Sequence, residues 1–171
     1  TRDNGAQAVL WSGARRLTGA RLHAMPALRP VRVRSGALGA DRPEGDLIVS
    51  PDHRLLLSGP KARDLFNTDE VLVAARDLID DRMVVTETAL REVTYVHLLT
   101  ERHEILRANG VDTESFHPAG ADLDMLEPGE REALLALLPG IAREPLRYGD
   151  YARRNLTAPE AAIWRYATCG S

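Results

Sequence analysis

The fold of this chain is decided by residues 93–110, which read VTYVHLLTERHEILRANG. Residues 93–100 are rich in β-branched and aromatic side chains, a composition typical of a strand. Residues 103–108 form a second extended segment that leads into Asn109-Gly110, a dipeptide that favours a tight turn because both residues tolerate a positive φ. The stretch therefore predicts a β-rich core.

Short apolar runs, separated by Gly, Pro, Asn and Asp, fill the part of the chain before this stretch. They predict strands at residues 31–34, 47–49, 54–57, 71–73 and 83–86. Residues 61–66 and 74–78 have the length of single helical turns. So many short strands favour an all-β core over alternating β–α units.

The chain opens on a turn rather than on a strand. Asn4-Gly5 is the turn dipeptide, and residues 7–11 (QAVLW) read as the strand that follows it. Most of the partner strand then lies upstream of Thr1. We therefore expect a domain without its first strand, whose unpaired edge favours a homodimer or a domain swap.

The last third of the chain has a helical character. Pro128 is placed to start a helix, since proline is tolerated in the first turn. Thr157 and Glu160 fit the N-cap and N3 positions of a capping box. The prediction is thus a β domain at residues 1–117 and a helical C-terminal extension at residues 118–171.

Composition and charge exclude several classes of function. Of the 171 residues, 44% are hydrophobic and 27% are charged, which supports a real core and excludes a disordered tail. The net charge of -3 excludes the electrostatic footprint of a nucleic-acid-binding protein. No apolar run approaches the roughly 20 residues of a membrane span, and no signal-peptide pattern occurs. We therefore expect neither nucleic acid nor membrane as a partner.

The tetrapeptide Ser50-Pro51-Asp52-His53 is the clearest candidate for chemistry. A hydroxyl and an imidazole lie three residues apart, and the proline fixes a bend that lets both side chains converge on one site. The plainer interpretation is a turn-forming serine beside a loop histidine. Common cofactor and zinc motifs are missing, so we expect no cofactor and no metal. A zinc site made by His53, His97 and His103 stays an alternative, although their spacing matches no ligand signature.

Three blocks of the chain together resemble the bacterial branch of Hint domains, the autoprocessing fold of hedgehog proteins and inteins. Residues 95–110 are similar to the family's Tyr-bearing strand and to its return strand, His-x-Φ-x-x-Asn-Gly with Φ apolar. Residues 46–56 hold Ser50-x-x-His53 where the family has Thr-x-x-His, and residues 114–118 look similar to the end of the branch. The resemblance implies a mainly β, pseudo-twofold, horseshoe-shaped domain, followed here by the helical extension.

The resemblance also implies a reaction. A Cys or Ser at the start of a Hint domain attacks the preceding carbonyl and converts a peptide bond into a thioester or ester. His53 then serves as the general acid for the departing amide nitrogen, and Ser50 holds the carbonyl or the imidazole. His103 fills a position that Hint domains often give to histidine, where it either assists catalysis or makes a structural hydrogen bond. His97 and His117 are expected at the surface or in satisfied hydrogen bonds.

Three departures from the family restrict that reaction. The one cysteine, Cys169, lies at the wrong end to be the nucleophile, and a single thiol leaves the redox compartment open. Glu114 and Ser115 stand where splicing inteins have His-Asn, and Val96 stands at their acidic position. We therefore expect no protein splicing. At most the upstream segment of the same polypeptide is cleaved, and a chain without the nucleophile is inactive.

Two further interpretations stay open at the level of sequence. The chain is a non-catalytic Hint-like scaffold or binding module of a secreted bacterial protein, or it is the product of processing upstream of Thr1. A bacterial, secreted protein fits the resemblance, and a cytoplasmic location stays an alternative. A Cys or Ser before Thr1 in the full gene favours autoprocessing, whereas Ala or Gly there favours the scaffold.

Overall fold

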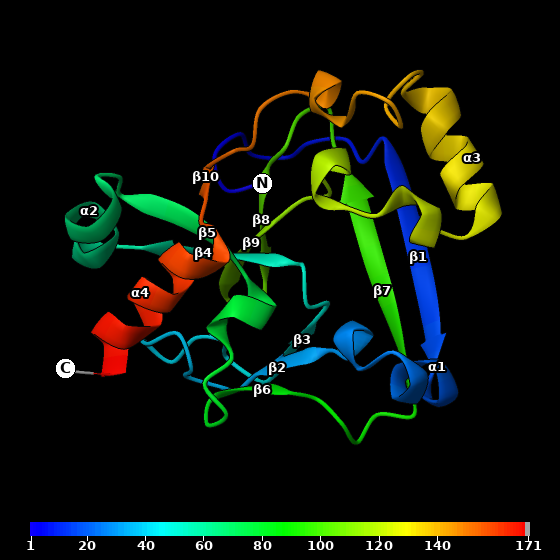
Figure 1. Ribbon diagram of the computed structural model, residues 1–171. Helices are drawn as coiled ribbons and strands as arrows, with labels where there is room; N and C mark the ends of the chain where they lie inside the picture. The colour runs from blue at the N-terminus through cyan, green and yellow to red at the C-terminus, as the bar shows by residue number, and fades with distance from the viewer. Residues whose placement is uncertain (170–171) are drawn as a thin grey trace.

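The longest strands of the computed structural model form a two-stranded antiparallel ribbon. β1 (Trp11–Thr18) pairs with β7 (Glu92–Leu99) over its whole length, with Trp11 opposite Leu99. Figure 1 shows this ribbon along one side of the molecule, with α3 (Pro128–Leu137) beyond it. The structure describes residues 1–169, and their side chains up to residue 167.

A five-stranded sheet forms the centre of the molecule. Its strand order is β10 (Arg154–Asn155), β5 (Glu70–Ala74), β4 (Arg54–Ser58), β9 (Val111–Glu114) and β8 (Ile105–Ala108). All neighbours are antiparallel except β10 and β5, which run parallel. Because β4 is the middle strand, the chain that enters it is anchored at the centre of the sheet.

Three short strands form the remaining sheet. Its order is β3 (Leu47–Val49), β2 (Val31–Val33) and β6 (Val84–Thr86), all antiparallel. β2 and β3 each bury their first and third side chains, as alternation along a strand requires. The middle residue of β2, Arg32, instead reaches the carboxylates of Asp46 and Glu87.

Four α-helices lie around the sheets within the described residues. They are α1 (Gly19–Ala24), α2 (Pro60–Phe66), α3, which begins at Pro128 as predicted, and α4 (Ala158–Cys169). The capping box is confirmed, because the Glu160 carboxylate accepts the backbone N–H of Thr157 at 2.8 Å. No helix among residues 1–169 has the length and apolar character that crossing a membrane requires.

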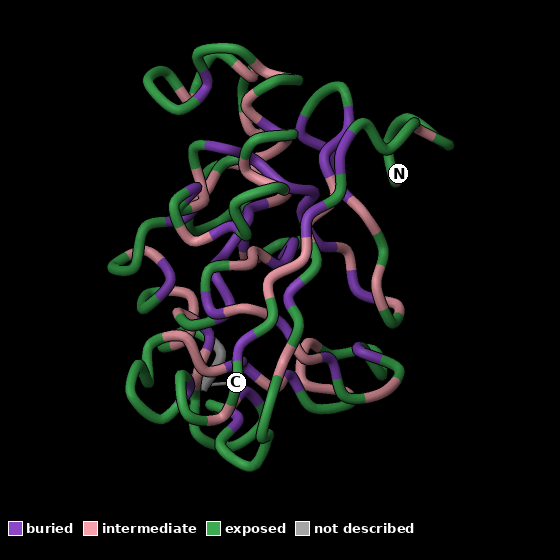
Figure 2. Tube along the Cα trace, turned by 90° about the vertical axis from the view of Figure 1, so that its right-hand side faces the viewer, coloured by how far each residue is buried: buried purple, intermediate pink, exposed green. Residues whose placement is uncertain are grey.

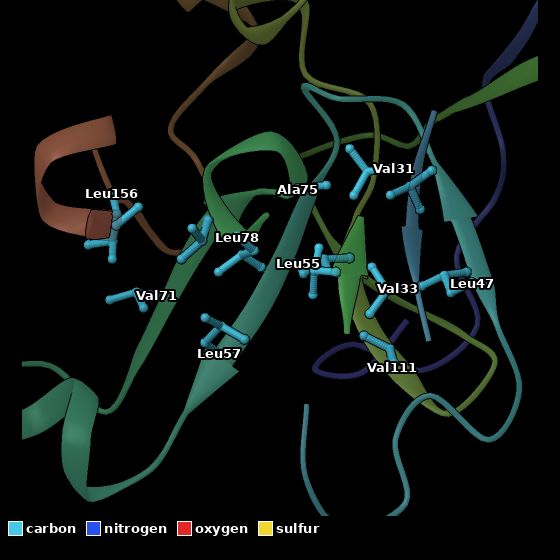
Figure 3. Close-up of a cluster of buried hydrophobic side chains, with 14 of the residues drawn as sticks. Val31, Val33, Leu47, Leu55, Leu57, Val71, Ala75, Leu78, Val111 and Leu156 are labelled. Carbon is cyan, nitrogen blue, oxygen red and sulfur yellow. The ribbon is translucent and has the colours of Figure 1, made fainter. Parts of the chain in front are cut away.

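The main hydrophobic core lies between the five-stranded and the three-stranded sheets. Figure 3 shows Val33 and Leu47 on one side facing Leu55 and Val111 on the other. A second cluster, which includes Trp11 and several leucines of the extension, joins the ribbon to α3. Figure 2 shows the buried positions concentrated along the middle of the chain trace, with exposed loops at the periphery.

Most of the predicted strands are confirmed, and with them the β-rich class. The strand predicted at residues 7–11 is wrong, because β1 begins only at Trp11, where pairing with β7 starts. The alternation of β1 is hard to see in sequence because Gly13 occupies a core-facing position. A Cβ at Gly13 would lie 2.3 Å from the Trp11 ring, which covers that position instead.

The extension shares the core of the β-rich part. β10 adds an edge strand to the five-stranded sheet, and the Leu156 N–H donates to the Leu72 carbonyl at 2.8 Å. Leu156 and Ala161 are buried in the main core. The division into two folding units at residue 117 stays a prediction. The pseudo-twofold horseshoe shape also stays a prediction.

Candidate functional site

The Ser50–His53 tetrapeptide forms a tight turn between β3 and β4. The His53 N–H donates to the Ser50 carbonyl at 3.1 Å, the bond that closes a β-turn with proline in its second position. The backbone N–H of Ala75 donates to the His53 carbonyl and that of Arg76 to the Pro51 carbonyl, both at 2.9 Å. The turn is therefore fixed against the segment that follows β5.

Ser50 and His53 are close in the chain but are not joined through their side chains. Within residues 1–167 the structure contains no hydrogen bond between the Ser50 hydroxyl and the His53 imidazole. Ser50 is half-buried at the end of β3. The turn therefore links the two residues through the backbone alone.

His53 lies immediately before the central strand and is half-buried. Burial is the main reason why the pKa of His53 is lowered, and the charge of Glu114 opposes that shift. Arg54 and His103 lower the pKa further. The imidazole is therefore neutral at neutral pH, so it can accept a proton from one group and pass it to another.

His103 is completely enclosed, and both of its ring nitrogens have partners. Nδ1 accepts the backbone N–H of Ala152 at 2.9 Å, so the proton of the neutral ring is on Nε2. Nε2 lies 3.1 Å from the Ser115 carbonyl and 3.3 Å from Oε2 of Glu114. The hydrogen bonds fix one tautomer and one orientation of this ring.

Glu114 is a buried carboxylate, which in the sequence stands out only because splicing inteins have His at this position. Its side chain is 8% exposed, and Oε1 accepts the backbone N–H of Arg54 at 2.9 Å. Burial by itself raises the pKa of Glu114, but the nearby His103 ring and the charge of Arg54 outweigh it and lower the pKa. Oε2 has no hydrogen bond of good geometry and faces His103. The site therefore holds an ionised carboxylate with an unused acceptor.

His97 also faces this cluster, which corrects the expectation that it lies at the surface or in satisfied hydrogen bonds. Alternate residues of β7 share a face, and Val96 rather than His97 points to solvent, with 63% exposure. The His97 ring lies 5.1 Å from that of Phe116. Burial, and next the charge of His53, lower the pKa of His97 to about 4. His97 therefore lies beside this cluster, one residue after Val96, which stands at the acidic position of inteins.

Three histidines and one carboxylate lie close enough together for their charges to interact: His53, His97, His103 and Glu114. The sequence predicts His53 and His103 as site residues, but not His97. His117 lies beside His103 and has satisfied hydrogen bonds, to Gly149 and Ala119. The described residues contain no group of three or more His, Cys, Asp or Glu side chains arranged to hold a metal ion.

The fold and this cluster define the class of protein: a β-rich domain in which a turn histidine, a return-strand histidine and a buried carboxylate converge. Residues 1–120 match the family described as the Hint domain. The chain therefore belongs to the Hint domain family. No curated protein and no solved structure gives a match to the chain. Residues 121–169 lie outside the family match.

The lowered pKa of His97 predicts a stability that falls in acid. Between about pH 4 and 6.5 the unfolded chain binds a proton that folded His97 does not, so the free energy of unfolding decreases as the pH is lowered. His97→Gln removes this contribution, at most about 2 kcal/mol between pH 7 and pH 5. Urea unfolding at both pH values measures it.

The matched control is His23→Gln, which alters an exposed histidine of α1. We expect the His97→Gln protein to lose less stability on acidification than the His23→Gln protein. Equal losses in both variants contradict the buried, neutral state of His97.

Proposed function

We propose that this Hint domain cleaves the polypeptide of which it is a part, at a peptide bond on its amino-terminal side, through a thioester or ester. The observation that carries this proposal is the neutral His53 imidazole, held on a fixed turn near the ionised Glu114. Membership of the Hint domain family supports an autoprocessing fold. The similarity of residues 46–56 to bacterial Hint domains supports a bacterial protein, secreted or cytoplasmic.

The proposed reaction needs a nucleophile from the polypeptide before Thr1. A Cys or Ser side chain there attacks the carbonyl carbon of its preceding residue, and its proton passes to His53. His53 then gives that proton to the amide nitrogen as the C–N bond breaks, which leaves a free α-amino group and a (thio)ester. Ser50 orients the carbonyl or the imidazole. Water or an external nucleophile resolves the ester.

His103 and Glu114 support this proton transfer in the proposal. An imidazolium forms transiently at His53, and a nearby carboxylate stabilises that charge. His103 Nε2 lies 3.3 Å from Glu114 Oε2 and faces the carboxylate. Both residues thus have positioning and electrostatic roles, while His53 handles the proton.

Protein splicing is not part of the proposal. Inteins release their carboxyl end by cyclisation of an Asn side chain, and Ser115 stands at that position. The Ser115 hydroxyl accepts the backbone N–H of Glu104 at 2.9 Å, and the backbone N–H of Ser115 donates to the Glu104 carbonyl. A serine in this role has no amide nitrogen to attack the backbone, so the reaction ends after amino-terminal cleavage. The 171-residue chain alone is then inactive.

A non-catalytic scaffold or binding module is the second candidate. The observation in its favour is that the His53 imidazole makes no hydrogen bond to any side chain within residues 1–167. On that interpretation the cluster stabilises the fold, and the domain presents a neighbouring part of the protein.

Mutation of His53 separates the two candidates. The longer natural polypeptide, with the residues before Thr1, is incubated with dithiothreitol or neutral hydroxylamine, and its fragments are weighed by mass spectrometry. We expect two fragments from the unmodified chain and at least about 100-fold slower cleavage in His53→Gln, because general acid–base catalysis contributes about that much. His23→Gln, the exposed control, cleaves normally. Equal cleavage in His53→Gln, or no cleavage with His53 intact, contradicts the mechanism.

We also propose a homodimer or domain swap through the edge of β1 that pairs with no strand among the described residues. Within the described residues β1 pairs with a single strand, and the Ala14 N–H on its other edge donates to the Glu130 carboxylate of α3 at 2.8 Å. Glu130→Ala uncovers this edge and raises the dimer fraction measured by light scattering, relative to the exposed control Glu132→Ala. Strictly monomeric protein in all variants contradicts the proposal.

A further inference from the structure

The segment of the extension at residues 148–155, here called the strap, crosses the candidate site. It follows α3 in the chain and ends in β10, which pairs with β5. Figure 1 shows this orange segment running from the short helix at the top of the molecule (Pro145–Tyr148) to β10 at the edge of the five-stranded sheet. The strap lies outside the residues that match the Hint domain family.

The strap contacts the candidate site through its backbone and one aromatic ring. The Ala152 N–H donates to His103 Nδ1 at 2.9 Å. The Tyr151 ring stacks on His117 at 3.9 Å between centroids and meets His103 edge-on at 5.4 Å. The His117 ring is bound to the strap a second time, because its Nε2 lies 3.0 Å from the Gly149 carbonyl.

The bond from Ala152 decides the tautomer of His103. With a donor at Nδ1, the ring proton is on Nε2, where it faces two acceptors, the Ser115 carbonyl and the Glu114 carboxylate. In the other tautomer a lone pair on Nε2 would face both acceptors, and the Nδ1 proton would face the Ala152 N–H. The Ala152 N–H and the Glu114 carboxylate therefore favour the same tautomer of His103, with the proton on Nε2.

Ion pairs and a side-chain hydrogen bond hold the strap at both ends. At its start, the Tyr148 hydroxyl donates to the Thr100 carbonyl at 2.9 Å. Near its end, Arg153 pairs with Glu70 of β5 at 2.5 Å and with Asp3 at 2.9 Å. The Arg54 guanidinium, which also contacts Glu114, lies over the Tyr151 ring. The position of Ala152 is thus fixed by contacts with four separate parts of the molecule.

We propose that the Ala152 N–H and the Tyr151 ring are positioning groups for His103, so that the extension completes the Hint site from outside the family-matched region. The part of this inference that concerns cleavage rests on the proposed function. The part that concerns the tautomer does not. Any residue except proline supplies the N–H, so the requirement at position 152 is on the backbone.

Ala152→Pro tests the inference in the full 171-residue chain, because proline removes the N–H. Long-range ¹H–¹⁵N NMR of the histidine rings distinguishes a protonated ring nitrogen from an unprotonated one. We expect His103 to be protonated at Nε2 in the unmodified chain and in the control Ala152→Gly, which keeps the donor. In Ala152→Pro we expect a mixture of tautomers or the Nδ1–H form. An unchanged Nε2–H signal, or Nδ1–H in the unmodified chain, overturns the inference.

Tyr151 provides a second pair of variants if Ala152→Pro does not fold. Tyr151→Ala removes the ring that packs on His117 and His103, and Tyr151→Phe restores it without the hydroxyl. We expect split or shifted His103 signals in Tyr151→Ala and native signals in Tyr151→Phe. Native signals in both variants contradict the role of the ring.

Cleavage of the longer polypeptide separates failure of this inference from failure of the proposed function. We expect Ala152→Pro to slow cleavage about 10-fold or more, since loss of the group that fixes the tautomer of a positioning histidine disturbs the geometry of the site. If the tautomer responds as expected while His53→Gln cleaves normally, the proposed function is wrong and the positioning role of the strap stands. If cleavage depends on His53 but the tautomer does not depend on Ala152, the strap inference is wrong.

Discussion

The carboxylate of Glu114 is buried at the end of β9, and a buried charge is tolerated only where partners replace the water that it loses. Two elements supply those partners. β4 provides the Arg54 backbone N–H and guanidinium, and the segment before β8 provides His103. The antiparallel pairing of β9 with both strands brings these groups to one carboxylate. The register of the central sheet and the ionised state of Glu114 therefore depend on each other.

The same carboxylate explains why the histidines around it can work as proton carriers. Burial lowers the pKa of His53 and of His97, and the charge of Glu114 acts in the opposite direction on both. A neutral imidazole next to a fixed negative charge can take up a proton at a small energetic penalty and release it again. The strap extends this arrangement beyond the family-matched region, because Ala152 orients the histidine that binds Glu114.

The sequence predicts the strands well where apolar runs are continuous, as in β2 to β8. It does not predict β1, because Gly13 and a pair of arginines interrupt the alternation, nor β10, which is two residues long and exists only by pairing with β5. For the site, the turn histidine and the return-strand histidine are visible as motifs. The positioning donor of Ala152 has no sequence signal, because every residue except proline carries a backbone N–H. The role of Glu114 cannot be predicted from the sequence either. One of its partners, Arg54, is more than fifty residues away along the chain, and the other, His103, comes from the segment before the neighbouring strand β8.

The ¹³C chemical shift of the Glu114 side-chain carboxyl, followed against pH, measures whether this buried group is ionised in the folded protein. Comparison with Glu114→Gln assigns the signal. We expect the midpoint of the titration to lie below 4.5, the ordinary value for a glutamate, because His103 and Arg54 outweigh the effect of burial. A midpoint above 4.5 would mean that Glu114 is held as a neutral acid, and would contradict both the ion-pair account of the sheet and the proton-transfer role of the cluster.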